Sequence, residues 1–342
     1  MAATLDDIAQ ELGISKGTVS KALNGAKDVS RKMQQAVLEK AVELGYSRLN
    51  RSTAAPRIAI FIINMQWSKP EDFGYDIVMG FRQAAEPAGY HVSIVPLDSN
   101  LQRSMRYDEY MMMENYHGSL VLGMSLLDPW IREFETCKTP TVLYDNHISG
   151  NPYVTNIGVD SVEGIQMAFD HLQTLGHRKI GYLSGALEAY VFQQRYQSFR
   201  QVVKRMGHSC DDTIIGSAYH INVCLSQHLP RLLKSGCTAI ICSHDLLANS
   251  VMIHCTELGL RIPEDISIMG YDDLPLSSYT VPPLTTIRQN RPALGKSAFY
   301  ALSSQLSGVA VGTHLLHAEL IQRSSCGPLS SSPPDMTRFF PE

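Results

Sequence analysis

The sequence lacks the cysteine pattern of a disulfide-bonded or zinc-binding protein. Its seven cysteines are odd in number and show no paired CxxC spacing, which favours free thiols in a reducing compartment. No apolar run approaches the ~20 residues that cross a bilayer. The first residues, MAATLDDIAQ, also lack the basic and apolar regions of a secretory signal. We therefore expect a cytoplasmic protein with no membrane partner.

Common catalytic signatures are missing as well. The motifs GxGxxG, GxxxxGK[ST], HExxH and GxSxG do not occur. The pairs His244-Asp245 and His254-Cys255 are neighbours only along the chain, which favours packed or capping residues over a catalytic pair. The sequence thus predicts no enzyme, no cofactor and no metal site.

Charge is unevenly distributed along the 342 residues, although the net charge is only −4. Residues 1–57 contain nine Lys and Arg against six Asp and Glu, whereas the remainder contains 20 against 27. A basic N-terminal region on an acidic body indicates that a polyanion would bind at the N-terminal region. The hydrophobic content of 44% is sufficient for two or three cores.

Three short helices are predicted in the N-terminal region, over residues 5–12, 15–23 and 30–44. Within each segment, apolar residues recur at helical spacing. Thr4, Ser15 and Ser30 stand where N-caps are expected, and Gly13 provides a tight turn between the first two helices. This succession is typical of a helix-turn-helix.

Short polar groups and lysines cover the outward face of the second helix: Ser15, Lys16, Gly17, Thr18, Ser20 and Lys21. Serine and threonine are short enough to bring a helix N-terminus close to phosphates, which its backbone N–H groups bind. Lys16 and Lys21 can reach guanine acceptors or phosphates, and Gly17 leaves room for a base edge or a sugar. The alternative is the solvated face of a small helical bundle. The caps, turn and spacing favour DNA binding.

The rest of the chain alternates between strand-like and helix-like segments. RIAIFII (57–63) is a continuous apolar run, the pattern of a parallel strand that is covered on both faces. Such alternation predicts two doubly wound α/β subdomains with parallel sheets. The helices are expected over 75–88, 101–116, 128–136, 161–175, 190–206, 222–235, 245–259 and 292–307.

Residues 4–46, TLDDIAQELGISKGTVSKALNGAKDVSRKMQQAVLEKAVELGY, resemble the DNA-binding head of the LacI family of bacterial transcriptional regulators. The T-x-x-D-I-A run, the GIS-x-x-TVS core and the terminal Leu-Gly-Tyr carry the resemblance. LQTLGHRKIGYLSG and LGLRIPEDISIMGYDDLPLSSYTVPPLTTIRQ are similar to the effector domain of this family, which has a periplasmic-binding-protein type I fold. The resemblance extends over residues 4–323.

The resemblance implies that Lys16, Gly17 and Lys21 read bases in the major groove. It assigns contacts with the DNA backbone to Ser15, Thr18, Ser20, Asn24 and Ser30, and the DNA-binding set is completed by Thr4, Arg48 and Arg51.

The hinge region departs from the family pattern. It lacks the usual Pro-Asn pair, and Ala55 and Pro56 stand where a leucine normally wedges into the minor groove. Either Leu49 replaces that wedge from another register, or Arg48 and Arg51 contact phosphates and the DNA bends less. We favour the second interpretation.

Candidate effector-binding residues lie near the ends of predicted strands. Ligands of open α/β sheets bind beyond the carboxyl ends of the strands, where the charged groups of Asp145, Arg195 and Asp245 could bind hydroxyl groups. Phe73 could stack on a sugar or a base. The resemblance places effector contacts at these four residues. Each could instead be a salt-bridged or capping residue, whereas Asp272 and Asp273 are interpreted as structural.

The predicted domains are a helix-turn-helix head (1–46), a short hinge (47–57), an effector-binding and dimerisation domain (58–323) and a flexible tail (324–342). The resemblance divides the effector domain into subdomains 58–158 with 290–318 and 159–289 with 319–323. The tail carries no leucine heptads, which argues against a tetramerising coiled coil.

We predict a homodimeric regulator, a repressor of carbohydrate-utilisation genes, that binds operator DNA and responds to a small effector such as a sugar. The alternatives are a solute-binding protein for transport, an α/β enzyme, or a regulator controlled by a phosphorylated carrier protein.

Overall fold

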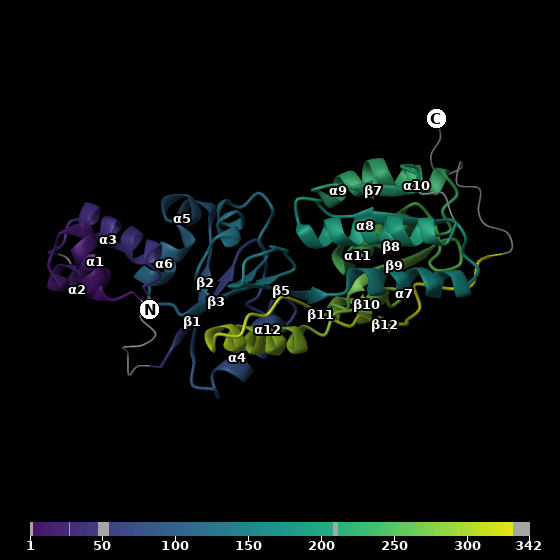
Figure 1. Ribbon diagram of the computed structural model, residues 1–342. Coiled ribbons are helices and arrows are strands. Elements are labelled where there is room, and N and C mark those ends of the chain that lie inside the picture. The colour runs from purple at the N-terminus through teal and green to yellow at the C-terminus, as the bar shows by residue number, and fades with distance from the viewer. Residues whose placement is uncertain (1–2, 27, 47–54, 208–210, 331–342) are drawn as a thin grey trace. The chain divides into compact units, whose positions relative to one another are not determined.

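The computed structural model describes residues 3–26, 28–46, 55–207 and 211–330 (Figure 1). These residues belong to two compact units, each built from several stretches of chain. Unit 1 contains Met1–Trp67, Gly74–Ile157 and Arg291–His314, and unit 2 contains Ser68–Phe73, Gly158–Asn290 and Leu315–Glu342. Arg48, Leu49, Arg51 and most of the predicted hinge lie outside the described residues.

Three helices form the N-terminal head: α1 (Leu5–Leu12), α2 (Lys16–Leu23) and α3 (Arg31–Glu43). Helix α1 begins at a capping box in which Thr4 and Asp7 bind each other's backbone N–H groups. It ends at Gly13, whose φ of 64° lies in the left-handed region that favours glycine. The hydroxyls of Ser15 and Ser30 cap α2 and α3. These caps fix where each helix begins.

The head has a core of its own. Ile8, Val19 and Val37, one from each helix, are fully buried in a single cluster. Tyr46, after the end of α3, packs into the same cluster. The apolar spacing therefore brings the three helices together as the helix-turn-helix pattern predicts.

Unit 1 contains a six-stranded sheet in the order β11-β5-β4-β3-β1-β2. Its strands are β1 (Arg57–Ile62), β2 (His91–Pro96), β3 (Gly118–Leu122), β4 (Thr141–Tyr144), β5 (Val154–Val159) and β11 (Thr313–Leu316). The pairs β1–β2, β1–β3, β3–β4 and β4–β5 are parallel. Residues 58–62 of β1 are buried, as expected for a continuous apolar run in a covered parallel strand.

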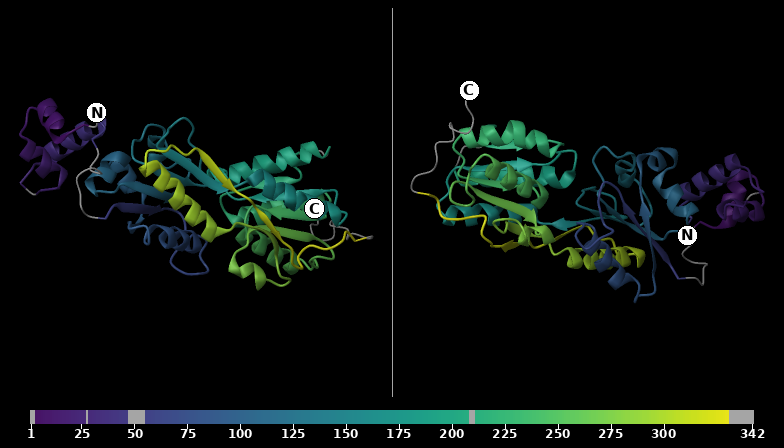
Figure 2. Two further views of the ribbon diagram at one scale, coloured as in Figure 1. Left: turned by 60° about the horizontal axis from the view of Figure 1, so that its bottom comes forward. Right: turned by 180° about the vertical axis from the view of Figure 1, so that it is seen from behind.

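Besides the helices of the head, this unit contains α4 (Tyr75–Ala85), α5 (Ser99–Ser104), α6 (Tyr107–Met113) and α12 (Arg291–Leu306), with short 3₁₀ turns at Pro129–Ile131 and Glu133–Glu135. Helices α4 and α12 are far apart in sequence but pack side by side (Figure 2). Glycines permit this close approach: a Cβ atom added to Gly80 would lie 2.2 Å from the carbonyl oxygen of Pro292.

Unit 2 contains a second six-stranded sheet in the order β12-β10-β9-β8-β6-β7. Its strands are β6 (Ile180–Ser184), β7 (Ile215–Ser217), β8 (Ala239–Cys242), β9 (Ser267–Asp272), β10 (Thr285–Arg288) and β12 (Glu319–Ile321). Only β12 runs antiparallel to its neighbour, β10, among the strand pairs whose register is determined.

Helices cover both faces of this sheet. They are α7 (Ser161–Thr174), α8 (Tyr190–Arg205), α9 (Ile221–Val223), a π-helical segment (Cys224–His228), α10 (Leu229–Lys234), α11 (Asp245–Glu257) and a 3₁₀ turn (Pro275–Ser278). Phe199 of α8 stacks on Tyr182 of β6, whereas Leu232 of α10 and Val251 of α11 share a cluster with Ile240 of β8. The predicted α/β fold class, in which a helical head is followed along the chain by two mainly parallel sheets, is confirmed.

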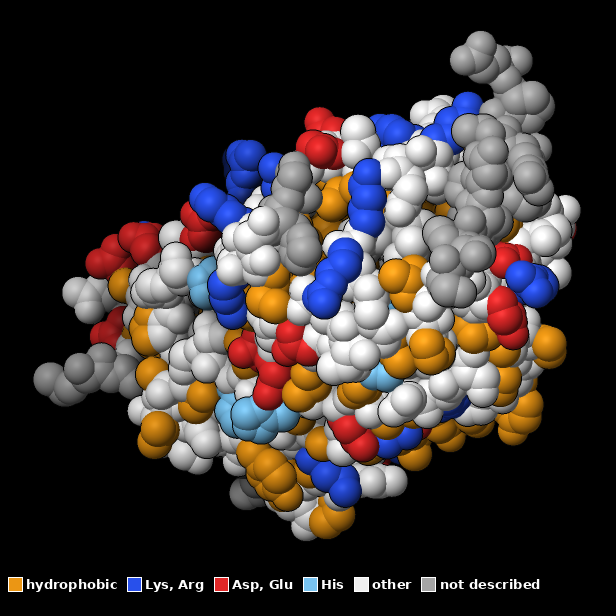
Figure 3. Space-filling model, turned by 90° about the vertical axis from the view of Figure 1, so that its right-hand side faces the viewer, with side chains coloured by type: hydrophobic (Ala, Val, Ile, Leu, Met, Phe, Trp, Pro, Cys, Tyr) orange, Lys and Arg blue, Asp and Glu red, His pale blue; other side chains and the backbone are white. Residues whose placement is uncertain are grey.

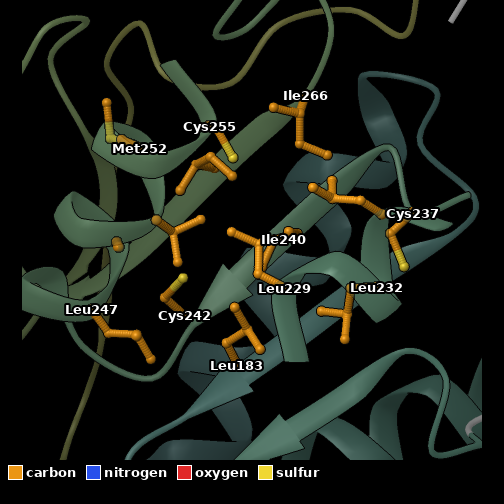
Figure 4. Packing of buried hydrophobic residues seen from close by; sticks show 14 of the residues in the cluster. Leu183, Leu229, Leu232, Cys237, Ile240, Cys242, Leu247, Met252, Cys255 and Ile266 are labelled. Atoms are coloured by element: carbon orange, nitrogen blue, oxygen red, sulfur yellow. The ribbon is translucent and has the colours of Figure 1, made fainter. Parts of the chain in front are cut away.

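Four buried cysteines belong to the core of unit 2. Cys237, Cys242 and Cys255 are separated by aliphatic side chains such as Ile240 in Figure 4. Burial raises the pKa values of Cys237 and Cys255, to about 11 and about 12. The six cysteines of the described part of the chain are all free thiols. No group of three or more potential metal ligands was found among the described residues.

Two features differ from the sequence prediction. The segment 101–116 is two helices, because Met105 is extended (φ −150°, ψ 143°). Its carbonyl oxygen accepts a hydrogen bond from the indole of Trp130 (2.9 Å), and Glu133 binds the backbone N–H of Tyr107 (2.7 Å). The predicted helix over 128–136, which provides these partners, is two 3₁₀ turns.

The second difference concerns the C-terminal segment. A flexible tail over 324–342 was predicted, but residues 324–330 pack against unit 2. Ser325 is fully buried and its hydroxyl donates to the carbonyl of Ile268 (2.6 Å). The carbonyl of Gly327 lies 3.0 Å from the imidazole of His177. Residues 331–342 lie outside the described part of the chain.

In the part of the chain that the structure describes, every helix is too short or too polar to span a membrane.

Candidate nucleic-acid interface and effector-domain residues

Helix α2 presents its N-terminus and two lysines on the surface of the head. The Ser15 hydroxyl accepts a hydrogen bond from the backbone N–H of Thr18 (3.1 Å) and lies 2.9 Å from the Thr18 hydroxyl. Ser15, Lys16 and Gly17 are exposed. The first N–H groups of a helix have no partner within it, and together with the helix dipole they favour a phosphate.

Gly17 has open space on its outer side. A Cβ atom there would meet only the Ser15 hydroxyl, at 3.6 Å, so neither backbone strain nor packing within the head requires glycine. The absence of a side chain instead lets another molecule approach the helix backbone closely.

The two lysines of α2 each form an ion pair within the head. The ammonium of Lys16 lies 2.6 Å from a carboxylate oxygen of Asp6, and that of Lys21 lies 2.5 Å from one of Asp28. The hydrogen bond from Lys21 lowers the pKa of the Asp28 carboxyl group. The side chains of all four residues are more than half exposed. The acidic partners could have been suspected from charge, but only the fold shows that they adjoin these lysines.

The other predicted DNA-binding residues lie at the ends or on the sides of the helices. Asn24 and Ser30 are exposed, whereas Thr4, Thr18 and Ser20 are half-buried. Thr4, Ser15 and Ser30 also serve as N-caps. Arg48 and Arg51 lie outside the described residues. The roles of the whole set in DNA binding stay predictions.

Phe73 and Asp145 lie in turns beside helix α4 and strand β4. Phe73, just before α4, is half-buried. Asp145 directly follows β4 and has a φ of 51°, an uncommon conformation for a residue other than glycine. Its backbone N–H donates to the carbonyl of Ile157 on β5 (2.8 Å). Both residues interact with other parts of the chain.

Arg195 is buried within unit 2. Its guanidinium group donates to the carbonyl of Ser243 (2.5 Å) and to the carboxylate of Asp272 (3.2 Å). It also lies 3.7 Å from the ring centre of Tyr271, a distance at which the cation and the ring attract each other. Gln289 donates to the same oxygen of Asp272 (2.7 Å). The structure therefore makes Asp272 a structural partner of Arg195.

Asp245 is the first residue of α11 and is fully buried. One carboxylate oxygen accepts hydrogen bonds from the Leu274 backbone (2.8 Å) and the Ser277 hydroxyl (2.6 Å). The other accepts one from the Thr286 hydroxyl (2.6 Å). Burial, together with the charge of Asp272, raises the pKa of Asp245 above its usual range. The hydrogen bonds of Asp245 thus join α11 to the segments that follow β9.

The two effector candidates on unit 2 are both anchored near the turn between β8 and α11. Arg195 binds the carbonyl of Ser243, and Ser243 directly follows β8 and precedes α11. His244 in the same turn stacks on Phe192, with ring centres 5.0 Å apart. The sequence did not indicate that Phe192 contacts His244 or that Tyr271 contacts Arg195, because only folding brings α8 close to the ends of β8 and β9.

Comparisons with known proteins agree with the head and the two sheets. Residues 4–48 match the family model "Bacterial regulatory proteins, lacI family", and residues 169–326 match "Periplasmic binding protein-like domain". The HTH-type transcriptional repressor CytR of Escherichia coli (strain K12) is 28% identical over 334 residues, which cover 95% of this chain and 96% of that protein. The head of this chain, residues 4–48, belongs to the lacI family of bacterial regulatory proteins.

A second relative and a solved structure agree. The HTH-type transcriptional regulator MalR of Streptomyces coelicolor (strain ATCC BAA-471 / A3(2) / M145) is 28% identical over 337 residues, 94% of each chain. The solved complex of the transcriptional regulator CelR with cellobiose superimposes with a TM-score of 0.69 at 23% identity, over 94% of this chain and 99% of that one. With a head that matches this family and regulators among its full-length relatives, the chain is a DNA-binding transcriptional regulator. The membership of residues 4–48 also decides against the transport-protein alternative.

Proposed function

We propose that this lacI-family regulator is a cytoplasmic repressor of carbohydrate-utilisation genes that acts by binding and not by catalysis. Residues 1–46 would form the DNA-binding domain, 47–57 the hinge and 58–323 the effector-binding and dimerisation domain. The observation that carries the proposal is α2: a capped, exposed helix end with two lysines on a head that has its own core.

In this proposal α2 lies in the major groove of operator DNA. Lys16 and Lys21 contact base edges, and Gly17 lets the helix backbone come close. The hydroxyls of Ser15 and Thr18 and the first N–H groups of α2 bind phosphates. Their exposed or half-exposed positions support this assignment. Asn24 and Ser30, at the ends of the next turn, extend the phosphate contacts.

The effector is proposed to be a sugar or sugar derivative that contacts Phe73, Asp145, Arg195 and Asp245. The related CelR structure is a cellobiose complex, which supports this class. In the free chain Arg195 and Asp245 have protein partners, so effector hydroxyls would have to share or replace them. The effector would change operator affinity only by binding one state of the regulator more tightly, with a coupling of about 1–3 kcal/mol.

A homodimer is proposed because operators with twofold symmetry require two heads. Unit 2 exposes Leu246 and Ile253, which are seven residues apart on one side of α11, by 50% and 53%. Tyr279 and Val281 are exposed by 84% and 90%, in the segment that Ser277 ties to the start of α11. Exposed apolar groups also occur among charged side chains in Figure 3. We assign the self-contact to the surface formed by these four residues.

The test starts with selection of a duplex from a random pool by the purified full-length chain. Fluorescence anisotropy then measures its affinity, alone and with a panel of mono- and oligosaccharides. We expect selective, salt-dependent binding that Lys16→Glu with Lys21→Glu abolishes. Failure to bind any duplex at low salt, or unchanged binding by the double variant, would overturn the proposal.

The homodimer has a separate test. Ile253→Glu is expected to yield monomers in analytical ultracentrifugation, whereas the control Glu257→Gln, at the end of the same helix, is expected to remain dimeric.

A further inference from the structure

The two lysines of α2 account for all of its charged side chains, and both are paired with acids outside the helix. Asp6 belongs to the first turn of α1, and Asp28 lies in the segment between α2 and α3. Helix α2, the proposed recognition helix, therefore approaches DNA with both of its lysine side chains already paired to acids of the head.

Neither acid is needed for a helix cap. Asp7, not Asp6, completes the capping box of α1 by accepting hydrogen bonds from the backbone and hydroxyl of Thr4 (2.7 and 2.8 Å). Ser30, not Asp28, caps α3. Asp6 and Asp28 are exposed by 64% and 59% at their side chains, so they also contribute nothing to the core.

Exposed ion pairs of this kind are weak, because water and salt screen the two charges. DNA can therefore separate each lysine from its acid. The carboxylate then remains within a few ångströms of the helix that meets the DNA, where phosphates repel it over a screening length of about 10 Å. The repulsion is offset only where the duplex offers the carboxylate a hydrogen-bond donor.

The major groove offers such a donor at cytosine. The N4 amino group of cytosine donates to aspartate, while the O6 and N7 atoms of guanine accept from lysine. A lysine and an aspartate side by side therefore match a guanine and a cytosine presented close together. The phosphate backbone offers acceptors alone and satisfies only the lysine.

We propose that Asp6 and Asp28 are specificity-determining residues of the DNA interface: they oppose binding to phosphates and tolerate binding where cytosine amino groups face them. The inference rests on the proposed function of α2. It predicts that these acids lower affinity for arbitrary DNA far more than affinity for the operator.

The test compares wild type with Asp6→Asn and Asp28→Asn, which remove one charge at constant size. The probes are the duplex selected by wild type and a random-sequence duplex of equal length, each titrated over a range of salt concentrations. Each variant is expected to bind the random duplex about tenfold more tightly at low salt. The slope of log K against log[salt] should steepen by up to about 0.9, the value for one additional phosphate contact. Operator affinity should change less than threefold, so specificity falls.

Glu39→Gln is the matched control. Glu39 is an exposed acid of the head on α3, and it accepts a hydrogen bond from Gln35 (3.0 Å), not from a lysine of α2. The same charge change at this site is expected to leave the ratio of operator to random affinity unchanged. A general effect of net charge would instead raise random-duplex affinity equally in all three variants, and would overturn the inference.

A double-mutant cycle tests the pairing itself. In a Lys16→Met background, Asp6→Asn is expected to lose the share of its effect on random DNA that comes from freeing Lys16, and to keep the share that comes from repulsion between the carboxylate and phosphates. An undiminished effect, or equal gains on operator and random duplexes, would refute the assignment. Thermal unfolding of each variant checks that the head is folded. If wild type bound no duplex at all, the proposed function would fail instead, which is a separate outcome.

Discussion

Individual residues of the effector domain show how far burial changes the role expected of a charged side chain. Asp245 was predicted from its position after a strand to face a ligand, yet it is fully buried and binds three groups of unit 2. Arg195 is also buried and lies between Tyr271 and Asp272. In the free chain both residues hold the strand ends together, and contact with an effector stays a prediction.

His244 gives this region a dependence on pH. Its imidazole is half-buried, and partial removal from water, with the nearby charge of Arg195, lowers its pKa to about 4 from 6.5. Between these values the unfolded chain binds a proton that the folded chain does not, so stability falls as the pH falls from 6.5 towards 4. Well inside this range, each fall of one pH unit lowers the free energy of unfolding by up to about 1.4 kcal/mol.

The variant His244→Phe is expected to reduce this dependence. Phenylalanine keeps the stacking on Phe192 but cannot titrate, although it loses the contact with the Ser243 hydroxyl (2.9 Å). Urea unfolding at pH 7.5 and 5.5 should show that the variant loses less free energy of unfolding than wild type over this interval, by about 1 kcal/mol. Parallel losses in the two proteins would contradict the assigned pKa shift. Absolute stability at pH 7.5 is not the criterion, because the lost hydrogen bond lowers it in the variant alone.

At the scale of secondary-structure elements, the contact between α4 and α12 depends on glycine. A Cβ atom at Gly80 would lie 2.2 Å from the carbonyl oxygen of Pro292, and one at Gly295 would lie 2.1 Å from that of Ile77. Because both obstacles are backbone, neither can rotate away. Gly80→Ala is expected to destabilise unit 1 by about 1–3 kcal/mol despite the higher helix propensity of alanine.

Gly17→Ala is the control for this prediction, because Gly17 also lies in a helix but has open space around it. Its substitution should leave the free energy of unfolding unchanged or raise it by up to about 1 kcal/mol. Denaturant unfolding of both variants makes the comparison. Equal effects of the two substitutions would mean that close packing at Gly80 is unimportant.

The C-terminal segment after β12 is a second test at this scale. A chain that ends at Arg323 loses the buried Ser325 and also Gly327, one of the two hydrogen-bond partners of His177. It should unfold at a lower denaturant concentration, because buried polar groups left without partners cost about 1–3 kcal/mol each. A chain that ends at Ser330 keeps these contacts and should match the full-length protein. Equal stability of both truncated chains would contradict the packing of residues 324–330.

Much of this architecture could be predicted from local sequence. The head was predictable because its caps, Gly13 and the apolar spacing lie close together in the chain. The strands were predictable because a parallel strand covered on both faces needs a continuous apolar run, as in 57–63. The interruption between α5 and α6 at Met105 could not be predicted, because the groups that stabilise it, Trp130 and Glu133, lie about 25 residues further along the chain. The ion pairs of α2 could not be predicted for the same reason, because the fold and not the spacing of residues along the chain decides which acid lies beside each lysine.

At the scale of the whole molecule, the hinge decides how binding by two heads deforms the operator. Residues 47–54 lie outside the described part of the chain, so the prediction rests on their sequence. Ala55 and Pro56 stand where the resemblance places a wedge leucine. Apolar wedges kink DNA by about 20–90° because they unstack a base step. Without one, Arg48 and Arg51 can still bind phosphates, but they cannot hold a step open.

We therefore expect this regulator to bend its operator less than a leucine-hinged relative bends its own. Fluorescence resonance energy transfer between dyes at the two ends of the selected duplex measures the bend. Ala55→Leu supplies the missing side chain and is expected to increase the bend, whereas Ala54→Ser, at the neighbouring position, is expected to leave it unchanged. A wild-type kink as sharp as that of the relative would mean that Leu49 inserts from a different register. In that case Leu49→Ala should straighten the DNA, because removing the wedge lets the bases stack again.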